Sequence, residues 1–323
     1  MRLRKPVLAA VLAAIASLAA PALAQDKPRV GMTYIVEHPA IDAVRDGILA
    51  ELKAAGYEDG KTIELVTRSA QGNMGTQAQI ASDFAGLNLD LAIAISTPSA
   101  QAVKNALKNK PVLFAAVTDP VGAGLIDSMA RPGGLVTGTS DQQPFPPVLE
   151  LMKTLVPGLQ RLGVIFNPGE ANAVSQVEAL KTAAKQYGLE IVEAPATQSS
   201  MVSDSARSLV GNVQAILLPT DSTVISVIES VVVVGLRAKL PVFASDTDAV
   251  ERGAVAALGF NYRDMGLATA RMAIRILNHT PPSDIPALVP EKQDLYLNTR
   301  SAKAMGVELP ISLVATARKV VGK

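Results

Sequence analysis

The sequence predicts an α/β protein made of two lobes, each built around a parallel sheet. Apolar stretches alternate repeatedly with helix-like segments, and a short cluster of Ser, Thr, Asp, Asn or Pro separates them. The pattern of residues 95–120 recurs in residues 218–249, which indicates an internal duplication. Ala, Val and Leu dominate while aromatic residues make up 3% of the chain, and short aliphatic side chains are typical of parallel sheets buried on both faces.

The first half of the chain carries four apolar segments of strand length. They are predicted at residues 29–36, 62–68, 89–95 and 111–117. Helices are predicted at residues 39–54 and 74–85, and a third begins at Thr97-Pro98, because Thr is a good N-cap and Pro suits the first helical turn. Asp119-Pro120 repeats this combination of a capping residue and a proline.

The second half repeats the order. Strands are predicted at residues 161–166, 189–194, 213–218 and 240–244, and helices at residues 173–187 and 203–209. The β-branched run 231–234 favours a strand by propensity, but we assign it to a helix because a strand there would break the alternation.

The last part of the chain has to serve both lobes. A strand at residues 254–260, a helix at 264–278, a strand at 294–298 and a terminal helix are predicted. Crossings between the lobes are expected near residues 139–143, 259–262 and 291–298, which makes a three-stranded hinge. The N-terminal lobe then comprises residues 28–141 and 262–291, and the C-terminal lobe residues 142–261 and 292–323.

The N-terminus predicts a signal peptide over residues 1–24. Arg2, Arg4 and Lys5 precede the apolar residues 7–20, and Ala22-Leu23-Ala24 matches a cleavage site after Ala24. A membrane anchor is the alternative, but this apolar stretch is shorter than the roughly 20 residues that span a bilayer. We therefore expect export to the periplasm.

Composition excludes several classes of function. Without residues 1–24 the chain keeps 27 of its 30 Lys and Arg against 29 Asp and Glu, so no basic surface for nucleic acid is expected. The absence of Cys excludes disulfides, thiol nucleophiles and a lipid-carrying N-terminal Cys, which favours a freely diffusing protein, expected to be monomeric. With only His38 and His279 and no glycine-rich phosphate motif, no metal and no cofactor are expected.

The candidate site lies where the strands end, because ligands of parallel sheets bind at the carboxyl edge. If the two edges face each other, one cleft receives polar side chains from both lobes. Ser96, Thr97 and Thr118 are candidates for holding a carboxylate at helix N-termini. Acidic candidates for an ammonium group are Glu37, Asp119, Asp221 and Asp246. Taken singly, each of these residues has helix capping as its alternative role.

Catalysis is weakly supported. Glu37-His38 is the best acid–base pair, but a His that precedes Pro usually serves in a loop or cap. Asp246 and Asp248 lack the further ligands that Ca²⁺ requires. Tyr34, Phe260 and Tyr262 lie near strand ends, where each is either a core residue or a platform for a ligand ring.

Several segments resemble one known family. AISTPSAQA, VTDPVGAGL, NPGEANAVSQV and LPTDSTV look like the substrate-binding proteins of ABC transporters, and more narrowly the members that bind tryptophan, phenylalanine or tyrosine. The likeness runs from Arg29 to the C-terminus. It implies two Rossmann-like lobes of the type I periplasmic-binding fold, no enzymatic activity and an inner-membrane permease as partner. Ser222 stands where relatives often carry Asn.

The resemblance also implies the ligand contacts. They are Glu37, Gln71, Ser96, Thr97, Thr118, Asp119, Asn172, Thr220, Asp221 and Asp246. We expect a periplasmic receptor for a small zwitterion, an aromatic or large apolar amino acid. The alternatives are a nucleobase or small organic acid as ligand, a sensory module for a membrane receptor, and an exported enzyme.

Overall fold

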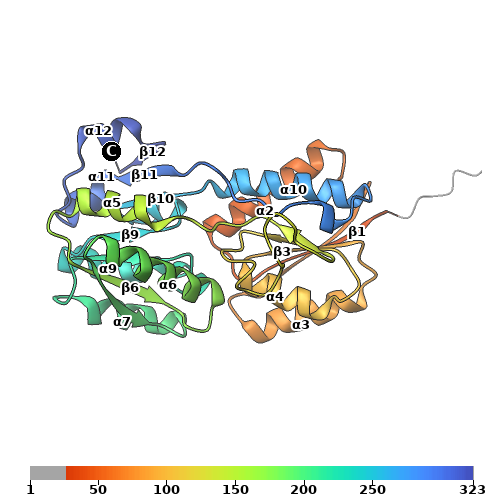
Figure 1. Cartoon of the computed structure of the whole chain (residues 1–323), viewed down its shortest axis with the longest axis horizontal. Helices are drawn as coiled ribbons and strands as arrows, with labels where there is room; N and C mark the ends of the chain where they lie inside the picture. The colour runs from red at the N-terminus through yellow and green to blue at the C-terminus, as the bar shows by residue number, and fades with distance from the viewer. Residues whose placement is uncertain (1–26, 323) are drawn as a thin grey trace, which may run out of the picture.

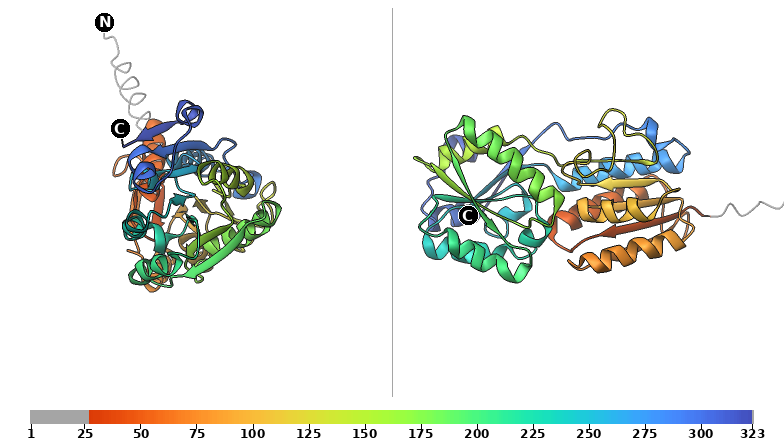
Figure 2. Two further views of the ribbon diagram at one scale, coloured as in Figure 1. Left: turned by 90° about the vertical axis from the view of Figure 1, so that its left-hand side faces the viewer. Right: turned by 60° about the horizontal axis from the view of Figure 1, so that its bottom comes forward.

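A computed structural model describes residues 27–322, which form two lobes joined along one side (Figure 1). The predicted signal peptide and its cleavage after Ala24 lie outside the described residues. Each lobe has a central sheet with helices on both faces (Figure 2). None of the helices in residues 27–322 combines the length and the apolar character needed to cross a membrane.

The first lobe contains a five-stranded parallel sheet in the order β2-β1-β3-β4-β5. Its strands are β1 (Arg29–Tyr34), β2 (Glu64–Ser69), β3 (Leu91–Ile95), β4 (Val112–Ala115) and β5 (Val136–Gly138). Its helices are α2 (Pro39–Ala54), α3 (Met74–Gly86), α4 (Thr97–Ala106) and α10 (Tyr262–Leu277). The central strand β3 is fully buried along its length, as its continuous apolar sequence predicts.

Helix α10 returns to this lobe late in the chain and packs against α2. Gly47 and Gly266 make the close approach possible, because a Cβ on Gly266 would overlap the backbone oxygen of Val44. The two helices cover one face of the sheet together with a cluster that includes Ile48, Met265 and Ala273. The other face packs beneath α3 and α4.

The second lobe contains a seven-stranded sheet in the order β12-β11-β10-β9-β8-β6-β7. Its strands are β6 (Arg161–Phe166), β7 (Glu190–Pro195), β8 (Ala215–Leu218), β9 (Val242–Ala244), β10 (Ala256–Gly259), β11 (Asp294–Asn298) and β12 (Lys319–Val321). Its helices are α5 (Phe145–Leu155), α6 (Ala171–Gln186), α7 (Val202–Leu209), α8 (Ser222–Ile225), α9 (Ile228–Ala238), α11 (Thr299–Ala304) and α12 (Ile311–Thr316). Short 3₁₀ turns cover Ser199–Met201, Asp248–Val250 and, in the first lobe, Pro282–Asp284. One core cluster fills this lobe.

The predicted alternation is confirmed, including the helix over residues 231–234, which lies in α9. The chain passes between the sheets three times: from β5 to α5, from β10 to α10, and from α10 to β11. The residues at which each lobe begins and ends stay a prediction.

Four details differ from prediction. Ser96 rather than Thr97 occupies the N-cap of α4, and no side chain caps that helix. Asp119-Pro120 begins a turn instead of a helix, because the Asp119 carboxylate accepts a bond from the Gly122 N–H. β11 runs antiparallel to β10, since the chain re-enters the lobe directly from the hinge. The expected terminal helix is two short helices followed by strand β12, which pairs with β11.

Candidate ligand-binding site

The carboxyl ends of both sheets meet around one cavity between the lobes. Its space, with its opening to solvent included, is about 390 Å³. Polar side chains from both sheets line it: His38, Ser96, Thr97, Thr118, Asp141, Asn172, Thr220, Asp221, Ser222, Asp246 and Tyr262. Its apolar lining is Ala40, Ile41, Ala116 and Ile225.

Seven of the ten predicted contacts are brought together around this cavity. They are Ser96, Thr97, Thr118, Asn172, Thr220, Asp221 and Asp246. These residues come from five separate loops that are distant in the sequence. The fold brings them together where the carboxyl edges of the two sheets face each other.

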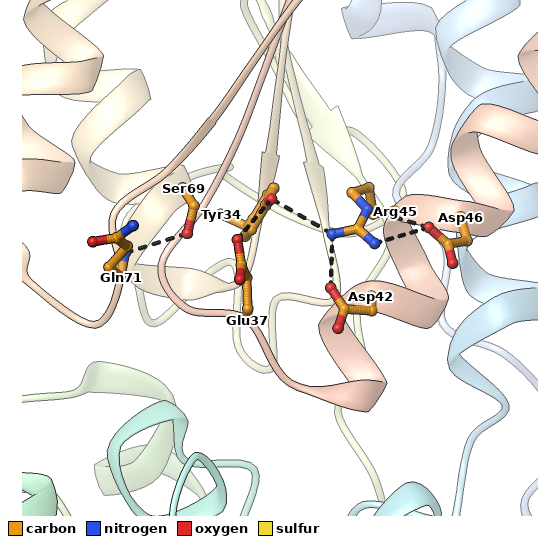
Figure 3. Close-up of polar contacts among 7 residues, drawn as sticks. All are labelled: Tyr34, Glu37, Asp42, Arg45, Asp46, Ser69 and Gln71. Carbon is orange, nitrogen blue, oxygen red and sulfur yellow. Dashed lines mark hydrogen bonds and ion pairs between the residues drawn. The ribbon is translucent and has the colours of Figure 1, made fainter.

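Glu37 and Gln71 lie outside the cavity, on the exposed rim of the first lobe (Figure 3). Glu37 accepts a long hydrogen bond of 3.5 Å from the Tyr34 hydroxyl. Gln71 follows the edge strand β2 in a left-handed turn with φ 52°, and its N–H donates to Ser69.

Arg45 organises the same rim. It pairs with Asp42 at 2.7 Å and with Asp46 at 3.1 Å, and its guanidinium lies 5.6 Å from the centre of the Tyr34 ring (Figure 3). Desolvation raises the pKa of Asp42, against the opposing effect of Arg45. Asp42, Arg45 and Asp46 are therefore paired with one another within the first lobe.

Asp119 also lies outside the cavity. One carboxylate oxygen accepts from the Gly122 N–H at 2.8 Å, and the other accepts from the Ser175 hydroxyl at 3.0 Å. Because Ser175 is on α6, the predicted ligand contact is a contact between the lobes.

Residues outside the ten predicted contacts complete the lining, among them Tyr262, one of the three aromatic candidates. Asp141 and Tyr262 come from two of the crossings, and the Tyr262 hydroxyl donates to Asp141 at 3.0 Å. Their positions in the predicted crossings were the available signal, because a crossing must run past the floor of the cleft. Ile41 and Ile225 carry no signal in the sequence, since they read as ordinary core positions of their helices.

On the side of the first lobe, the start of α4 faces the cavity. Its first turn presents backbone N–H groups that have no partner within the helix. Thr97 Oγ1 is buried and has no hydrogen-bond partner. Both features suit an anionic group of a ligand.

Ser96 holds this helix start in a strained conformation. Its φ of 81° and ψ of 157° fall in a region that is otherwise nearly restricted to glycine. A buried hydrogen-bond chain supports it: Ser96 Oγ lies 3.4 Å from Ser99 Oγ, Ser99 donates to Gln77 at 2.9 Å, and Gln77 donates to Thr33 at 3.2 Å. Such strain is typical of functional sites, where the surrounding structure enforces it.

On the side of the second lobe, Asp221 caps α8. Its carboxylate accepts from the Val224 N–H at 2.8 Å and from the Asn167 N–H at 2.6 Å. Asn172 donates to the Thr220 carbonyl at 2.7 Å, while its own side-chain oxygen is buried without a partner. This side of the cavity therefore presents acceptors.

The cavity combines several carboxyl groups with no lysine or arginine in its lining. Burial raises the pKa of Asp221 to about 8, and the neighbouring Glu170 adds to the effect. Burial also raises the pKa of Asp246 to about 7, with a contribution from Asp248, and raises the pKa of Asp141. Burial lowers the pKa of His38 to about 4, and Arg252 adds to this. The site thus favours a cationic group on the ligand, since such a group would neutralise buried carboxylates.

Direct hydrogen bonds join the lobes across the cleft. Gln176 of α6 donates to Thr118 at 3.3 Å, and the hydroxyls of Thr118 and Thr220 lie 3.4 Å apart. Two facing α/β lobes with a buried polar cavity at their shared edge define a two-lobed receptor for a small molecule.

The comparison with protein families agrees with this class. Residues 29–321 match the family described as ABC transporter substrate binding protein. The chain belongs to the ABC transporter substrate-binding proteins. It is 39% identical over 279 residues to a tyrosine-binding protein of Clostridioides difficile (strain R20291), which covers 86% of this chain and 81% of the relative.

Two solved structures differ instructively in how well they superpose. An ABC domain in complex with L-Trp from Streptococcus pneumonia is 30% identical to this chain and gives a TM-score of 0.88. The match covers 91% of this chain and 100% of the ABC domain. The second is the ligand-free, open structure of a substrate-binding protein with adhesive properties from Clostridium difficile. It is 40% identical, and the match covers 92% of this chain and 100% of that protein, yet the TM-score is 0.69. This chain therefore superposes better on the L-Trp complex than on the open structure, in agreement with the direct hydrogen bonds between its lobes.

Proposed function

We propose that this protein is the periplasmic substrate-binding component of an ABC importer and that it closes around a zwitterionic amino acid. The observation that carries the proposal is the charge pattern of the cavity. Buried carboxyl groups of Asp221 and Asp246 lie on one side, and the start of α4 with the unpaired Thr97 hydroxyl lies on the other. A zwitterion has both complementary charges, and burial of either charge without a partner would be costly.

The ligand's ammonium group is assigned to Asp221 and the unpaired oxygen of Asn172. Its carboxylate is assigned to Thr97 and the N–H groups of the α4 start. Thr118 is a weaker partner for the carboxylate than the sequence suggested, because its hydroxyl already donates to Asp141 at 2.8 Å.

An aromatic or large apolar side chain is the best occupant for the rest of the cavity. Ile41 from the first lobe and Ile225 from the second provide aliphatic surface, and both are almost fully buried. The names of a tyrosine-binding relative and of a structure in complex with L-Trp support the same class of ligand. A small organic acid fits less well, because it would add a negative charge to a cavity of carboxyl groups.

The remaining parts of the proposal rest on the family. They are export by the predicted signal peptide, docking on an inner-membrane permease, a monomeric state, and binding without catalysis or cofactor. A sensory role is the alternative for the same protein, and neighbouring permease and ATPase genes would argue against it.

A thermal-shift panel tests the ligand class. We expect L-tyrosine, L-tryptophan or L-phenylalanine to raise the melting temperature of the purified mature protein, because a ligand that binds only the folded state stabilises it by mass action. Nucleobases and dicarboxylic acids serve as the competing classes. A shift with either of these and none with an amino acid would refute the proposal.

A further inference from the structure

We propose that Asp119 and Ser175 form a latch that aligns the two halves of the binding site without touching the ligand. Neither residue lines the cavity, and they are contributed by different lobes. They act as positioning residues for closure. The inference rests on the proposed binding function for its affinity readout, but the latch itself can be measured in ligand-free protein.

The geometry of Asp119 fixes one half of the latch. The Gly122 N–H holds one carboxylate oxygen at 2.8 Å, so the other oxygen is directed at the Ser175 hydroxyl, 3.0 Å away. Gly122 leaves room for this arrangement, because a Cβ at that position would displace the Asp119 carboxylate. The bond is charge-assisted and therefore stronger than a hydrogen bond between neutral groups.

The neighbouring residues connect the latch to the cavity. Gln176 follows Ser175 on α6, is buried, and contacts both Thr118 of the first lobe and Thr220 of its own lobe. Its side-chain oxygen accepts from the Thr220 N–H at 3.2 Å, which anchors it within the second lobe. Asp119 directly follows Thr118, which lines the cavity, and Ser175 directly precedes Gln176, which contacts the cavity residues Thr118 and Thr220.

A contact formed only in the closed state raises the closed population. Apparent affinity scales with the fraction of protein that is competent to bind tightly. Loss of the latch should therefore weaken every ligand by the same factor, whereas loss of a contact to the ligand's side chain changes the preference among ligands. Because amino acids share their ammonium and carboxylate groups, a measurement in ligand-free protein separates the latch from a contact to those charges.

Binding measurements test the latch first. Ser175→Ala is expected to weaken L-tyrosine and L-tryptophan binding equally, by about five- to twentyfold, through faster dissociation. Asp119→Ala should weaken both ligands at least as much, because it also removes the bond to the Gly122 N–H, and the double variant should be no worse than Asp119→Ala alone. Thr182→Ala, an exposed position on the same helix, is the matched control and should change nothing. Unequal factors for the two ligands, or additive losses, would overturn the proposal.

Fluorescence transfer in ligand-free protein tests it independently of any ligand. The chain has no cysteine, so Ser82→Cys on α3 and Ser208→Cys on α7 can be labelled without background. These helices lie away from the hinge segments in Figure 1, so opening should separate them. We expect Ser175→Ala to lower the high-transfer population and Ser175→Thr to retain it. An unchanged population in Ser175→Ala would disprove the latch, whereas failure of all amino acids to bind would refute only the proposed function.

Discussion

In the proposed binding mode, recognition of the ligand's positive charge depends most on Asp221. It is 1% exposed, and Glu170 lies close enough to raise its pKa further. A bound ammonium group would relieve the repulsion between these carboxyl groups. The same carboxylate also orders the loop at Asn167 and the start of α8, so substitution to Ala would mix a binding effect with a structural one.

We therefore predict that Asp221→Asn weakens L-tyrosine binding by about 2–5 kcal/mol, the usual cost of losing one partner of a buried charge pair. Titration calorimetry measures the change. Asp83→Asn is the control, because Asp83 is an exposed carboxyl on α3 that does not line the cavity. If Asp221→Asn binds as tightly as the wild type, the ammonium site lies elsewhere.

The strained backbone at Ser96 predicts that Gly and Ala at this position differ in their effect on stability. Ser96→Gly removes both the strain and the hydroxyl, whereas Ser96→Ala removes only the hydroxyl. We expect Ser96→Gly to be more stable than Ser96→Ala by roughly 1–2 kcal/mol, because Gly adopts this backbone conformation freely. Urea unfolding of the two variants measures the difference. Equal stability would show that the conformation carries no strain.

At the scale of elements, the packing of α2 on α10 joins residues more than 200 positions apart and fixes the hinge to the first lobe. The helices can approach closely because Gly47 and Gly266 meet at the crossing. The obstacle to a larger residue at position 266 is the backbone of α2, which cannot rotate aside as a side chain would.

Gly266→Ala should therefore destabilise the protein by about 1–3 kcal/mol, the range for overpacking a core. Gly86→Ala is the control, because a Cβ at Gly86 meets open space at the end of α3. Thermal unfolding of both variants measures the effect. A Gly266→Ala variant as stable as the wild type would contradict the close packing.

The elements and part of the site follow from sequence, and the exceptions have physical reasons. Strand ends identify the edge at which ligands bind, but they do not fix where each side chain points. Gln71 follows β2, which is at the far edge of its sheet, and Asp119 is turned aside by Gly122. Ile41 and Ile225 could not be distinguished from core residues, because both roles require the same apolar side chain.

At the scale of the whole molecule, the buried carboxyl groups make stability depend on pH. The folded-state pKa values of Asp221 and Asp246 are about 8 and 7, against 3.8 in the unfolded chain. The folded protein therefore holds more protons than the unfolded chain, and stability falls as pH rises through these values. His38 acts in the opposite direction, since its pKa falls from 6.5 to about 4, but most of its effect lies below pH 6.5.

We predict that ligand-free protein loses about 2 kcal/mol of unfolding free energy between pH 6.5 and pH 8. Urea titrations at the two pH values measure this loss. The variant with both Asp221→Asn and Asp246→Asn should show a much smaller dependence. A stability that rises over this interval would contradict the assignment of protons to the two carboxyl groups.

The central claim is that both charges of an α-amino acid are recognised in the cavity between the lobes. Calorimetry with L-tyrosine, tyramine and 3-(4-hydroxyphenyl)propionate tests it directly, because the last two each lack one charge of the first. We predict that L-tyrosine binds at least about a hundredfold more tightly than either analogue, as loss of a buried ion pair requires. Equal affinity for all three would show that the ring alone is recognised and would contradict the account.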